Sequence, residues 1–287
     1  MNWGPAREET LPQLVRFLSD REWGCVTFSS RLVNGGTLTL PARRDNRISV
    51  CRSDGTDSIC GAVLHTGHGF YYPVFHPDDG AASELWISEL RKALRLSTSR
   101  VHSIMGVKRD VAALESLVPR IASHQIEYYL MVETRNTQTT SSTLPAGLEF
   151  RRATPRDAGN LFPLQRAYEL EEVLLPGDRF DAETCMYHLG QNLAEQIIYV
   201  AEIDGYPVAK AGTNARGFGF DQIGGVFTRP EYRGRGIGAA IMTRLMRMLA
   251  SERKQCCLFV KIQNAPAIAM YRRLGYVVRD EFRITYY

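Results

Sequence analysis

A run rich in arginine and glycine, from Arg233 to Gly238, has the composition of an anion-binding turn. It follows an apolar run that stops at Pro230, and a helix-forming run begins inside it. Glycine lets the backbone approach a ligand that any Cβ would hold off. The N–H groups and the dipole at a helix N-terminus favour negative charge. We therefore predict that this turn binds a phosphate or pyrophosphate group, with Arg233 and Arg235 adding positive charge.

Two well-known phosphate-binding patterns do not fit this turn. A P-loop requires G-x-x-x-x-G-K-[ST], and no lysine follows these glycines. A dinucleotide-binding turn requires an acidic residue near the end of the next strand, but that strand ends at 260–263, Val-Lys-Ile-Gln. Both patterns are disfavoured.

A second motif follows the next predicted strand: N-A-P-A-I-A-M-Y-R-R-L-G-Y, from Asn264 to Tyr276. Together with R-x-x-G-x-G (Arg233 to Gly238), it resembles the GNAT superfamily of acyl-CoA-dependent N-acyltransferases. The two motifs occur in that family's order and at its spacing. The resemblance covers residues 148–287, about half of the chain.

The resemblance assigns roles to particular positions. It implies acetyl-CoA as a co-substrate, with no metal, and a CoA pyrophosphate held by backbone amides of the turn. The strand before the turn would pair with the pantetheine arm, Asn264 would lie near the cofactor, and Tyr271 would lie near the thioester sulfur. The cofactor-binding positions are Val226, Phe227, Thr228, Arg233, Gly234, Arg235, Gly236, Ile237, Gly238 and Asn264.

Tyr271 is the candidate general acid. A thiol of pKa ~8.5 that leaves as a thiolate can take a proton from a positioned phenol. The alternative is a core aromatic, because Ile268, Tyr271 and Leu274 share one face of a short helix.

The amine acceptor must also lose a proton before it can attack, and the sequence offers three candidate carboxylates. Glu171 or Glu172 continues a helical stripe that begins at Leu161 and includes Tyr168, which would carry the carboxylate towards the interior. A solvated helix edge is an equally good interpretation of Glu172. Asp221, on the strand before the turn, is the third candidate, although it is far from the end of that strand.

The elements that must position these residues follow a clear order. A strand at 148–153, a helix from Thr154-Pro155 to about Leu175, and a second helix from Asp181 come first. Three strands follow, the first two joined by a tight turn at Asp204-Gly205. A helix to about Ser251, a strand, a short helix and a final strand complete the order β-α-α-β-β-β-α-β-α-β.

The first half shows the later part of this order more faintly, which predicts two tandem copies of one architecture. We place a degenerate domain at 1–133, a linker rich in Ser and Thr at 134–147, and the catalytic domain at 148–287. The segment that would correspond to the phosphate turn, Phe75 to Leu85, carries Asp78 and Asp79 where arginine and repeated glycine are expected. This half should therefore not bind CoA.

Composition excludes several other classes of protein. The 287 residues are 44% hydrophobic and 23% charged, with a net charge of +4 and no block of like charge, which is typical of a globular protein without a nucleic-acid-binding tail. The six cysteines form no C-x-x-C pair, so neither a zinc site nor a disulfide framework is indicated. No signal peptide or membrane span is apparent, and we expect a reducing cytoplasm.

These observations together predict an α/β fold with a mixed sheet, in two tandem GNAT-like domains. The expected activity is direct transfer of an acyl group, most simply acetyl, from acyl-CoA to a small-molecule or peptide amine. The expected protein is a monomer or homodimer that binds neither nucleic acid nor membranes. The alternatives are a non-catalytic acyl-CoA-binding sensor, because no base is unambiguous, and a nicotinamide-dependent enzyme that uses the glycine-rich turn.

Overall fold

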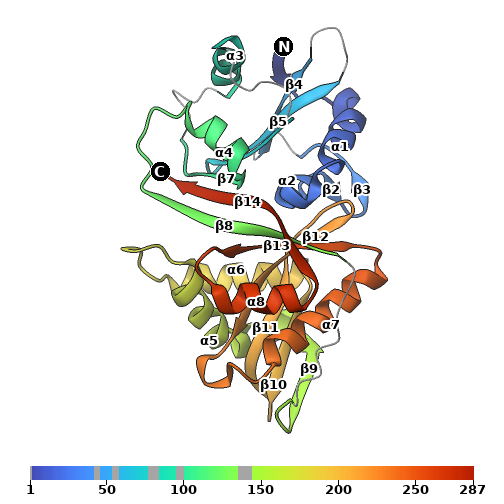
Figure 1. Cartoon of the computed structure of the whole chain (residues 1–287), viewed down its shortest axis with the longest axis vertical. Coiled ribbons are helices and arrows are strands. Elements are labelled where there is room, and N and C mark those ends of the chain that lie inside the picture. The colour runs from blue at the N-terminus through green and yellow to red at the C-terminus, as the bar shows by residue number, and fades with distance from the viewer. Residues whose placement is uncertain (1, 42–45, 54–57, 77–83, 95–99, 135–143) are drawn as a thin grey trace.

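The computed structural model describes the whole chain except residues 1, 42–45, 54–57, 77–83, 95–99 and 135–143. Its framework is one mixed sheet of 12 strands in the order β1-β4-β5-β6-β7-β14-β8-β13-β12-β11-β10-β9. The N-terminal half of the chain forms one end of this sheet and the C-terminal half forms the other (Figure 1). The expected α/β fold with a mixed sheet is therefore confirmed.

The C-terminal half has the predicted order of elements. They are β9 (Leu148–Arg152), α5 (Ala158–Tyr168), the π-helical turn η4 (Glu169–Val173), α6 (Ala182–Glu195), β10 (Ile198–Ile203), β11 (Tyr206–Arg216), β12 (Phe220–Thr228), α7 (Ile237–Ser251), β13 (Gln255–Lys261), α8 (Ala265–Arg273) and β14 (Tyr276–Tyr286).

The N-terminal half repeats the later part of this order and adds a strand, a short helix and a small hairpin that the sequence did not predict. Its elements are β1 (Asn2–Pro5), α1 (Leu11–Ser19), α2 (Val26–Ser30), β2 (Val33–Asn34), β3 (Thr37–Leu38), β4 (Asn46–Arg52), β5 (Ile59–Thr66), β6 (Phe70–Phe75), α3 (Glu84–Leu94), β7 (Ser103–Val107), α4 (Lys108–Glu115) and β8 (His124–Glu133).

Local capping explains where several of these elements begin. Thr154 forms a capping box with Asp157, whose carboxylate accepts the Thr154 N–H at 2.7 Å. Asp181 caps α6 by accepting the N–H groups of Glu183 and Thr184. Asp204 and Gly205 both have positive φ, as the tight turn between β10 and β11 requires.

The two halves exchange their last strands. Strand β8, the last of the N-terminal half, lies between β13 and β14, while β14, the last of the C-terminal half, lies between β7 and β8. Both long strands cross the middle of the molecule (Figure 1). Each half is thus completed by a strand of the other, an arrangement that the sequence did not predict. Residues 135–143 of the predicted linker lie outside the described residues.

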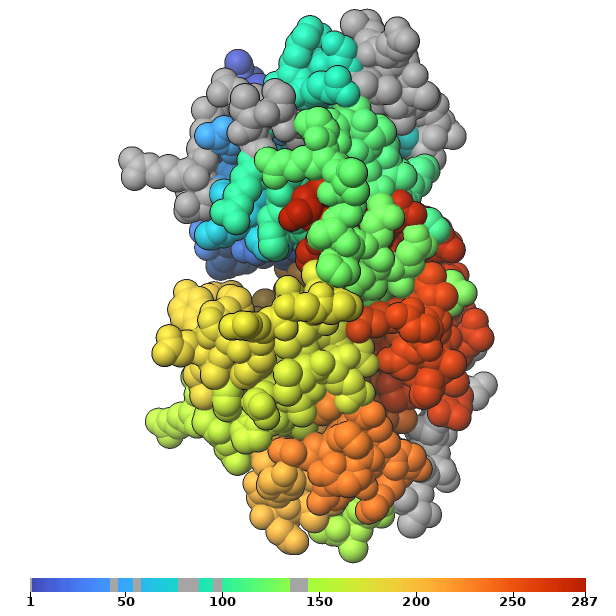
Figure 2. Space-filling model, turned by 90° about the vertical axis from the view of Figure 1, so that its left-hand side faces the viewer, coloured from blue at the N-terminus to red at the C-terminus, as the bar shows by residue number. Residues whose placement is uncertain are grey.

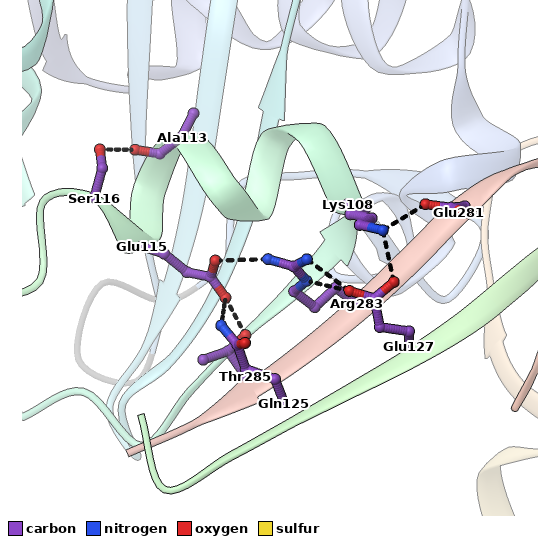
Figure 3. Close-up of polar contacts among 9 residues, drawn as sticks. All are labelled: Lys108, Ala113, Glu115, Ser116, Gln125, Glu127, Glu281, Arg283 and Thr285. Atoms are coloured by element: carbon purple, nitrogen blue, oxygen red, sulfur yellow. Dashed lines mark hydrogen bonds and ion pairs between the residues drawn. The ribbon is translucent and has the colours of Figure 1, made fainter. Parts of the chain in front are cut away.

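An ionic network ties α4 to both exchanged strands (Figure 3). Arg283 on β14 contacts Glu127 on β8 at 2.6 Å and Glu115 at the end of α4 at 3.0 Å. Lys108, the first residue of α4, lies 2.7 Å from both Glu127 and Glu281. Hydrogen bonding from Lys108 holds the pKa of Glu127 below its usual range. The network gives the exchange a specific register at the surface, where an isolated pair would contribute little.

Helices cover both faces of the C-terminal half. Helices α7 and α8 pack on one face around a core that includes Ile241, Leu245 and Tyr276. Helices α5 and α6 pack on the other face around Leu164 and Leu189. The candidate site residues come from both layers: η4 follows α5 on one face, and the glycine-rich turn and α8 lie on the other.

Candidate active site

The site begins where two parallel strands separate. Strands β12 and β13 pair only from Phe220–Gln255 to Ile223–Leu258. Beyond that point β12 continues to Thr228, paired with β11, while β13 continues paired with β8. The last residues of β12 therefore present an edge that β13 does not cover, and the two strands form an open wedge.

A cavity of about 410 Å³ occupies this wedge. It brings together segments far apart in the sequence: the π-helical turn, the end of β12, the glycine-rich turn and α8. In Figure 2 the yellow segment that contains α6 meets the red segment that contains α8 on this side of the molecule. The lining residues are Glu171, Glu172, Val226, Phe227, Thr228, Tyr232, Arg233, Gly234, Gly236, Ile237, Gly238, Ala239, Asn264, Pro266, Ala267, Met270, Tyr271 and Arg273.

The glycine-rich turn fits a phosphate group. Gly234 and Gly236 both have φ of 75°, a conformation that L side chains rarely adopt. Gly236 is the N-cap of α7, and no side chain caps this helix, so its first N–H groups are available to an anion. A Cβ on Gly238 would lie 3.2 Å from the Met270 sulfur, so a larger residue would make this side chain shift where α7 packs on α8.

The two arginines of the turn behave differently. Arg233 forms a bidentate contact with Glu171, both distances being 2.8 Å, and its Nε donates to the Thr228 carbonyl at 2.9 Å. The pair is more than two-fifths exposed on both sides, so water screens it and a ligand anion can compete for the guanidinium. Arg235 lies over the Tyr232 ring at 5.5 Å and does not line the cavity.

Tyr271 lines the cavity from α8. Its ring packs against Tyr276 at 5.8 Å. Burial raises its pKa above the usual value of 10, and the nearby phenol of Tyr168 and carboxylate of Glu172 raise it further. The Tyr271 hydroxyl therefore keeps its proton at neutral pH, which is what a proton donor requires. It is both a core aromatic and a cavity residue, so the two interpretations of the sequence are compatible.

Asn264 begins α8 and also faces the acidic turn. Its side-chain oxygen accepts the Ala267 N–H at 3.2 Å, which caps the helix, and its amide donates to Glu172 at 3.4 Å. Lys261, at the end of β13, contacts the same carboxylate at 3.2 Å. Glu172 is thus held by two donors from the β13–α8 connection.

Of the three candidate carboxylates, two line the cavity and one does not. Glu171 and Glu172 both line the cavity, because the helix widens into a π-helical turn at Glu169–Val173. Such turns are frequent at functional sites. The helix ends at Val173, slightly before the expected Leu175. Asp221 is fully buried, forms an ion pair with Arg216 at 3.3 Å, and does not line the cavity. Its place in the strand, before β12 and β13 separate, explains why it cannot reach the wedge.

Several residues of the site were not identified from the sequence. Met270 and Arg273 line the cavity from α8, and the arginine adds a cation on that side. Lys210 on β11 lies under the site, with its ammonium over the Tyr168 ring at 4.3 Å. The single lysine within the apolar strand P-V-A-K-A-G was a signal that could have revealed it.

The described residues contain neither a metal-binding cluster nor a membrane-spanning helix. Within the described residues, no group of three or more His, Cys, Asp or Glu side chains is arranged to hold a metal ion. None of the helices formed by those residues is both long and apolar enough to cross a membrane.

Comparison with known proteins places part of the C-terminal half in a family. Residues 165–276 match the model of the Acetyltransferase (GNAT) family. A stretch of 63 residues is 35% identical to mycothiol acetyltransferase of Corynebacterium aurimucosum; it is 22% of this chain and 21% of that protein. The match thus spans about a fifth of the length of this relative.

Two solved structures resemble the whole chain in fold. A tandem GNAT protein from the clavulanic acid biosynthesis pathway superposes with a TM-score of 0.60 at 15% identity, over 99% of this chain and 97% of that one. An acetyltransferase of the GNAT family from Colwellia psychrerythraea superposes with a TM-score of 0.57 at 9% identity, over 100% of both chains. The family that the two motifs indicated is confirmed for residues 165–276, which match a GNAT domain, and the chain as a whole shares the fold of these two solved structures.

Proposed function

We propose that this protein transfers an acetyl group from acetyl-CoA directly to an amine acceptor. The observation that carries the proposal is the cavity itself, in which an uncapped helix N-terminus, an open strand edge and a buried, protonated tyrosine face one space. Acetyl-CoA supplies the activated acyl group when bound.

Different residues of the cavity bind the pyrophosphate, bind the pantetheine arm and donate the proton. The first N–H groups of α7, with Arg233, hold the pyrophosphate, and the exposed edge of β12 from Val226 to Thr228 holds the pantetheine arm by main-chain hydrogen bonds. Tyr271 gives its proton to the departing sulfur. Because the phenol has a raised pKa, it remains protonated until charge develops on that sulfur.

Glu171 and Glu172 are the two cavity carboxylates that we assign to the acceptor. A carboxylate there can bind an ammonium group and lower the cost of bringing it into the wedge. Both carboxylates already have cationic or amide partners, Arg233 for Glu171 and Lys261 with Asn264 for Glu172. An acceptor amine therefore has to displace or share one of these contacts.

The same pairing favours a second candidate function, a non-catalytic acyl-CoA-binding sensor. Neither glutamate is free to act as a base, because each is engaged by another side chain. Such a sensor would bind acyl-CoA in the cavity without catalysing acyl transfer.

Thiol release from acetyl-CoA, measured against panels of small amines, amino acids and peptides, separates the two functions. Release that depends on both acetyl-CoA and an amine supports the transferase. Acetyl-CoA binding by calorimetry without release against any amine supports the sensor. If neither acetyl-CoA nor CoA binds to the full chain, both functions are wrong.

A further inference from the structure

Lys210 is a buried cation next to the cavity that the proposed mechanism does not use. It lies on β11, and only 6% of its surface is exposed. Its ammonium donates to the main-chain carbonyl of Gly225 at 3.0 Å and lies 4.3 Å from the centre of the Tyr168 ring. Within the part of the chain that the structure describes, no carboxylate approaches it within ion-pair distance.

Folding alone gives no reason for a lysine here. Removing an ammonium from water is costly when no carboxylate pairs with it. Burial lowers the pKa of Lys210 from 10.5 to about 8, although Glu169 on the π-helical turn and Cys185 on α6 raise it in the opposite direction. An apolar side chain of similar length would fill the space without this cost. Groups that burden stability in this way occur preferentially at functional sites.

Gly225, whose carbonyl accepts from Lys210, lies just beyond Ile223, the last residue of β12 that pairs with β13. Gly225 has φ of 60°, and the pairing of β12 with β11 shifts register between Lys210 and Gly212. A Cβ on Gly225 would lie 2.9 Å from the Lys210 ammonium. A Cβ here would make the ammonium shift, and the positive φ of Gly225 also favours glycine, so the observed contact suits a glycine at this bulge.

This hydrogen bond also fixes the next N–H group. In a trans peptide the carbonyl and the following N–H point in opposite directions. Because Lys210 holds the Gly225 carbonyl on its own side, the N–H of Val226 is directed away from Lys210. Val226 and Tyr271 both line the cavity, and the proposed function places the thioester sulfur at Tyr271, so the Val226 end of the β12 edge is the end next to the acyl group.

We propose that Lys210 is a positioning residue, which locks the Gly225–Val226 peptide so that the Val226 N–H is held towards the acyl carbonyl. This inference rests on the proposed function, because it requires acetyl-CoA in the wedge. A donor that is fixed in place before the reaction needs no reorganisation when charge develops on that oxygen. Loss of one such donor typically lowers kcat by ~10² to 10³, and a donor that is loosened rather than lost should cost less.

The test compares the full-length parent with Lys210→Met, using acetyl-CoA labelled with ¹³C at the acyl carbonyl. The carbonyl stretch of the bound ligand is read by infrared difference spectroscopy, which needs no turnover. We expect the parent to shift this band to lower frequency than in free acetyl-CoA, and Lys210→Met to lose most of the shift. In the same variant kcat should fall by about 10- to 100-fold, while acetyl-CoA affinity changes by less than about threefold.

Two further variants keep the test decisive. Lys210→Gln retains an uncharged donor, so it should keep part of the shift, and it replaces Lys210→Met if that variant does not fold. Lys254→Met is the matched control, because Lys254 also donates to main-chain carbonyls, those of Gly217 and Phe218, but neither of these residues adjoins a residue that lines the cavity. It should leave the band unchanged.

The positioning role of Lys210 and the proposed acetyl transfer can fail separately in these experiments. Acetyl-CoA that binds to parent and variants with the same carbonyl band overturns the role of Lys210 and leaves the proposed function standing. A parent that does not bind acetyl-CoA overturns both. A large loss of affinity in Lys210→Met, with the band unchanged in the fraction still bound, would identify Lys210 as a structural support only and would also overturn the inference.

Discussion

The two halves of the molecule open the same wedge and fill it differently. In the C-terminal half, β12 and β13 separate beyond Ile223 and leave the cavity of about 410 Å³. In the N-terminal half, β6 and β7 pair in parallel only at Phe70–Ser103 and Tyr71–Ile104, so β6 also runs on beyond its parallel partner. The separation of the strands is therefore common to both halves.

Side chains of the chain itself close the N-terminal wedge. At the end of β6 the N–H of Phe75 donates to Asp110 at 3.3 Å, and the Phe75 carbonyl accepts from Arg21 at 2.6 Å and Arg109 at 3.3 Å. These three side chains line a cavity of only about 170 Å³. The strand edge that could pair with a pantetheine arm in one half is occupied by protein groups in the other.

The two halves therefore share the separation of the strands but not the space that it leaves. Arg233 also bonds the end of β12, at the Thr228 carbonyl, but the cavity there has more than twice the volume of the cavity at the end of β6. The expectation that the N-terminal half does not bind CoA rested on Asp78 and Asp79, which lie outside the described residues. The contacts of Phe75 support the same expectation independently.

Removal of the Tyr271 hydroxyl should have the largest effect. Tyr271→Phe keeps the ring and deletes the proton, so kcat should fall by ~10² to 10⁴, as is typical of acid–base groups, with acetyl-CoA affinity nearly unchanged. Tyr276→Phe is the control, because Tyr276 packs against Tyr271 but does not line the cavity. Steady-state kinetics and calorimetry measure both quantities. A loss of binding as large as the loss of turnover would show that Tyr271 only supports the packing.

A carboxylate in the glycine-rich turn should make the C-terminal half resemble the N-terminal half. Gly236→Asp places a negative charge and a side chain at the N-cap of α7, where φ is 75°. Like charges in contact cost several kcal/mol, so acetyl-CoA affinity should fall by at least ~10²-fold. Gly177→Asp is a matched control, because Gly177 also has positive φ but does not line the cavity. Unaltered affinity in Gly236→Asp would remove the turn from the cofactor site.

The buried lysine distinguishes the halves by the pH dependence of stability. Its pKa is lowered to about 8 in the fold from 10.5, so the unfolded chain binds more protons between these values and stability rises with pH. The parent should gain about 3 kcal/mol in unfolding free energy relative to Lys210→Met between pH 8 and 10.5. Strand β5, the neighbour of β6 in the N-terminal half, carries no buried charge. Denaturant titrations in which the difference between parent and variant is independent of pH would contradict this prediction.

Asp110 should matter for folding and not for the cofactor. Asp110→Ala leaves the buried N–H of Phe75 without this acceptor and removes a partner of Arg109, which should cost about 1 to 3 kcal/mol. Asp110→Asn keeps an acceptor and should cost less. Calorimetry should still give one acetyl-CoA per chain for both variants. A second binding site in either variant, or in the parent, would show that the N-terminal wedge is competent to bind the cofactor.

Local patterns were sufficient to predict most of the elements and most of the site. The glycine-rich turn, Asn264, Tyr271 and the two glutamates are near each other in space because each occupies a defined end of an element. Asp221 was misplaced because a strand pattern does not tell where its neighbour departs. The exchange of β8 and β14 was missed for a related reason: local periodicity specifies a strand but not the strand with which it pairs.

The role of Lys210 could not be predicted from the sequence either, because a strand pattern does not specify what a buried side chain contacts. Alternation along β11 marks it as an anomaly, but only the bulge at Gly225 shows what it contacts. Likewise the π-helical turn, which lets both Glu171 and Glu172 line the cavity, was not predicted from the sequence. A simple helical stripe predicts one inward carboxylate, whereas the structure places two.

The smallest expected effect concerns Glu171. Its contact with Arg233 is well formed but exposed, so breaking it should change stability by no more than about 1 kcal/mol. Glu171→Gln frees the Arg233 guanidinium for the pyrophosphate, and acetyl-CoA affinity should rise by up to about fivefold, since 1 kcal/mol is a factor of about five. If Glu171 also binds the acceptor ammonium, the acceptor KM should rise in the same variant.

Glu172→Gln provides the comparison, because Glu172 contacts Lys261 and Asn264 instead of the phosphate-binding turn. It should leave acetyl-CoA affinity unchanged and affect only acceptor KM or kcat. A fall in kcat that shrinks as pH rises, when the free amine becomes abundant, would identify Glu172 as the base. Kinetics of both variants indistinguishable from those of the parent from about pH 6 to 9 would exclude both carboxylates from the acceptor site. The proton of the amine would then leave through water. In that case the C-terminal wedge would differ from the closed N-terminal wedge only by the space that it leaves for the substrate.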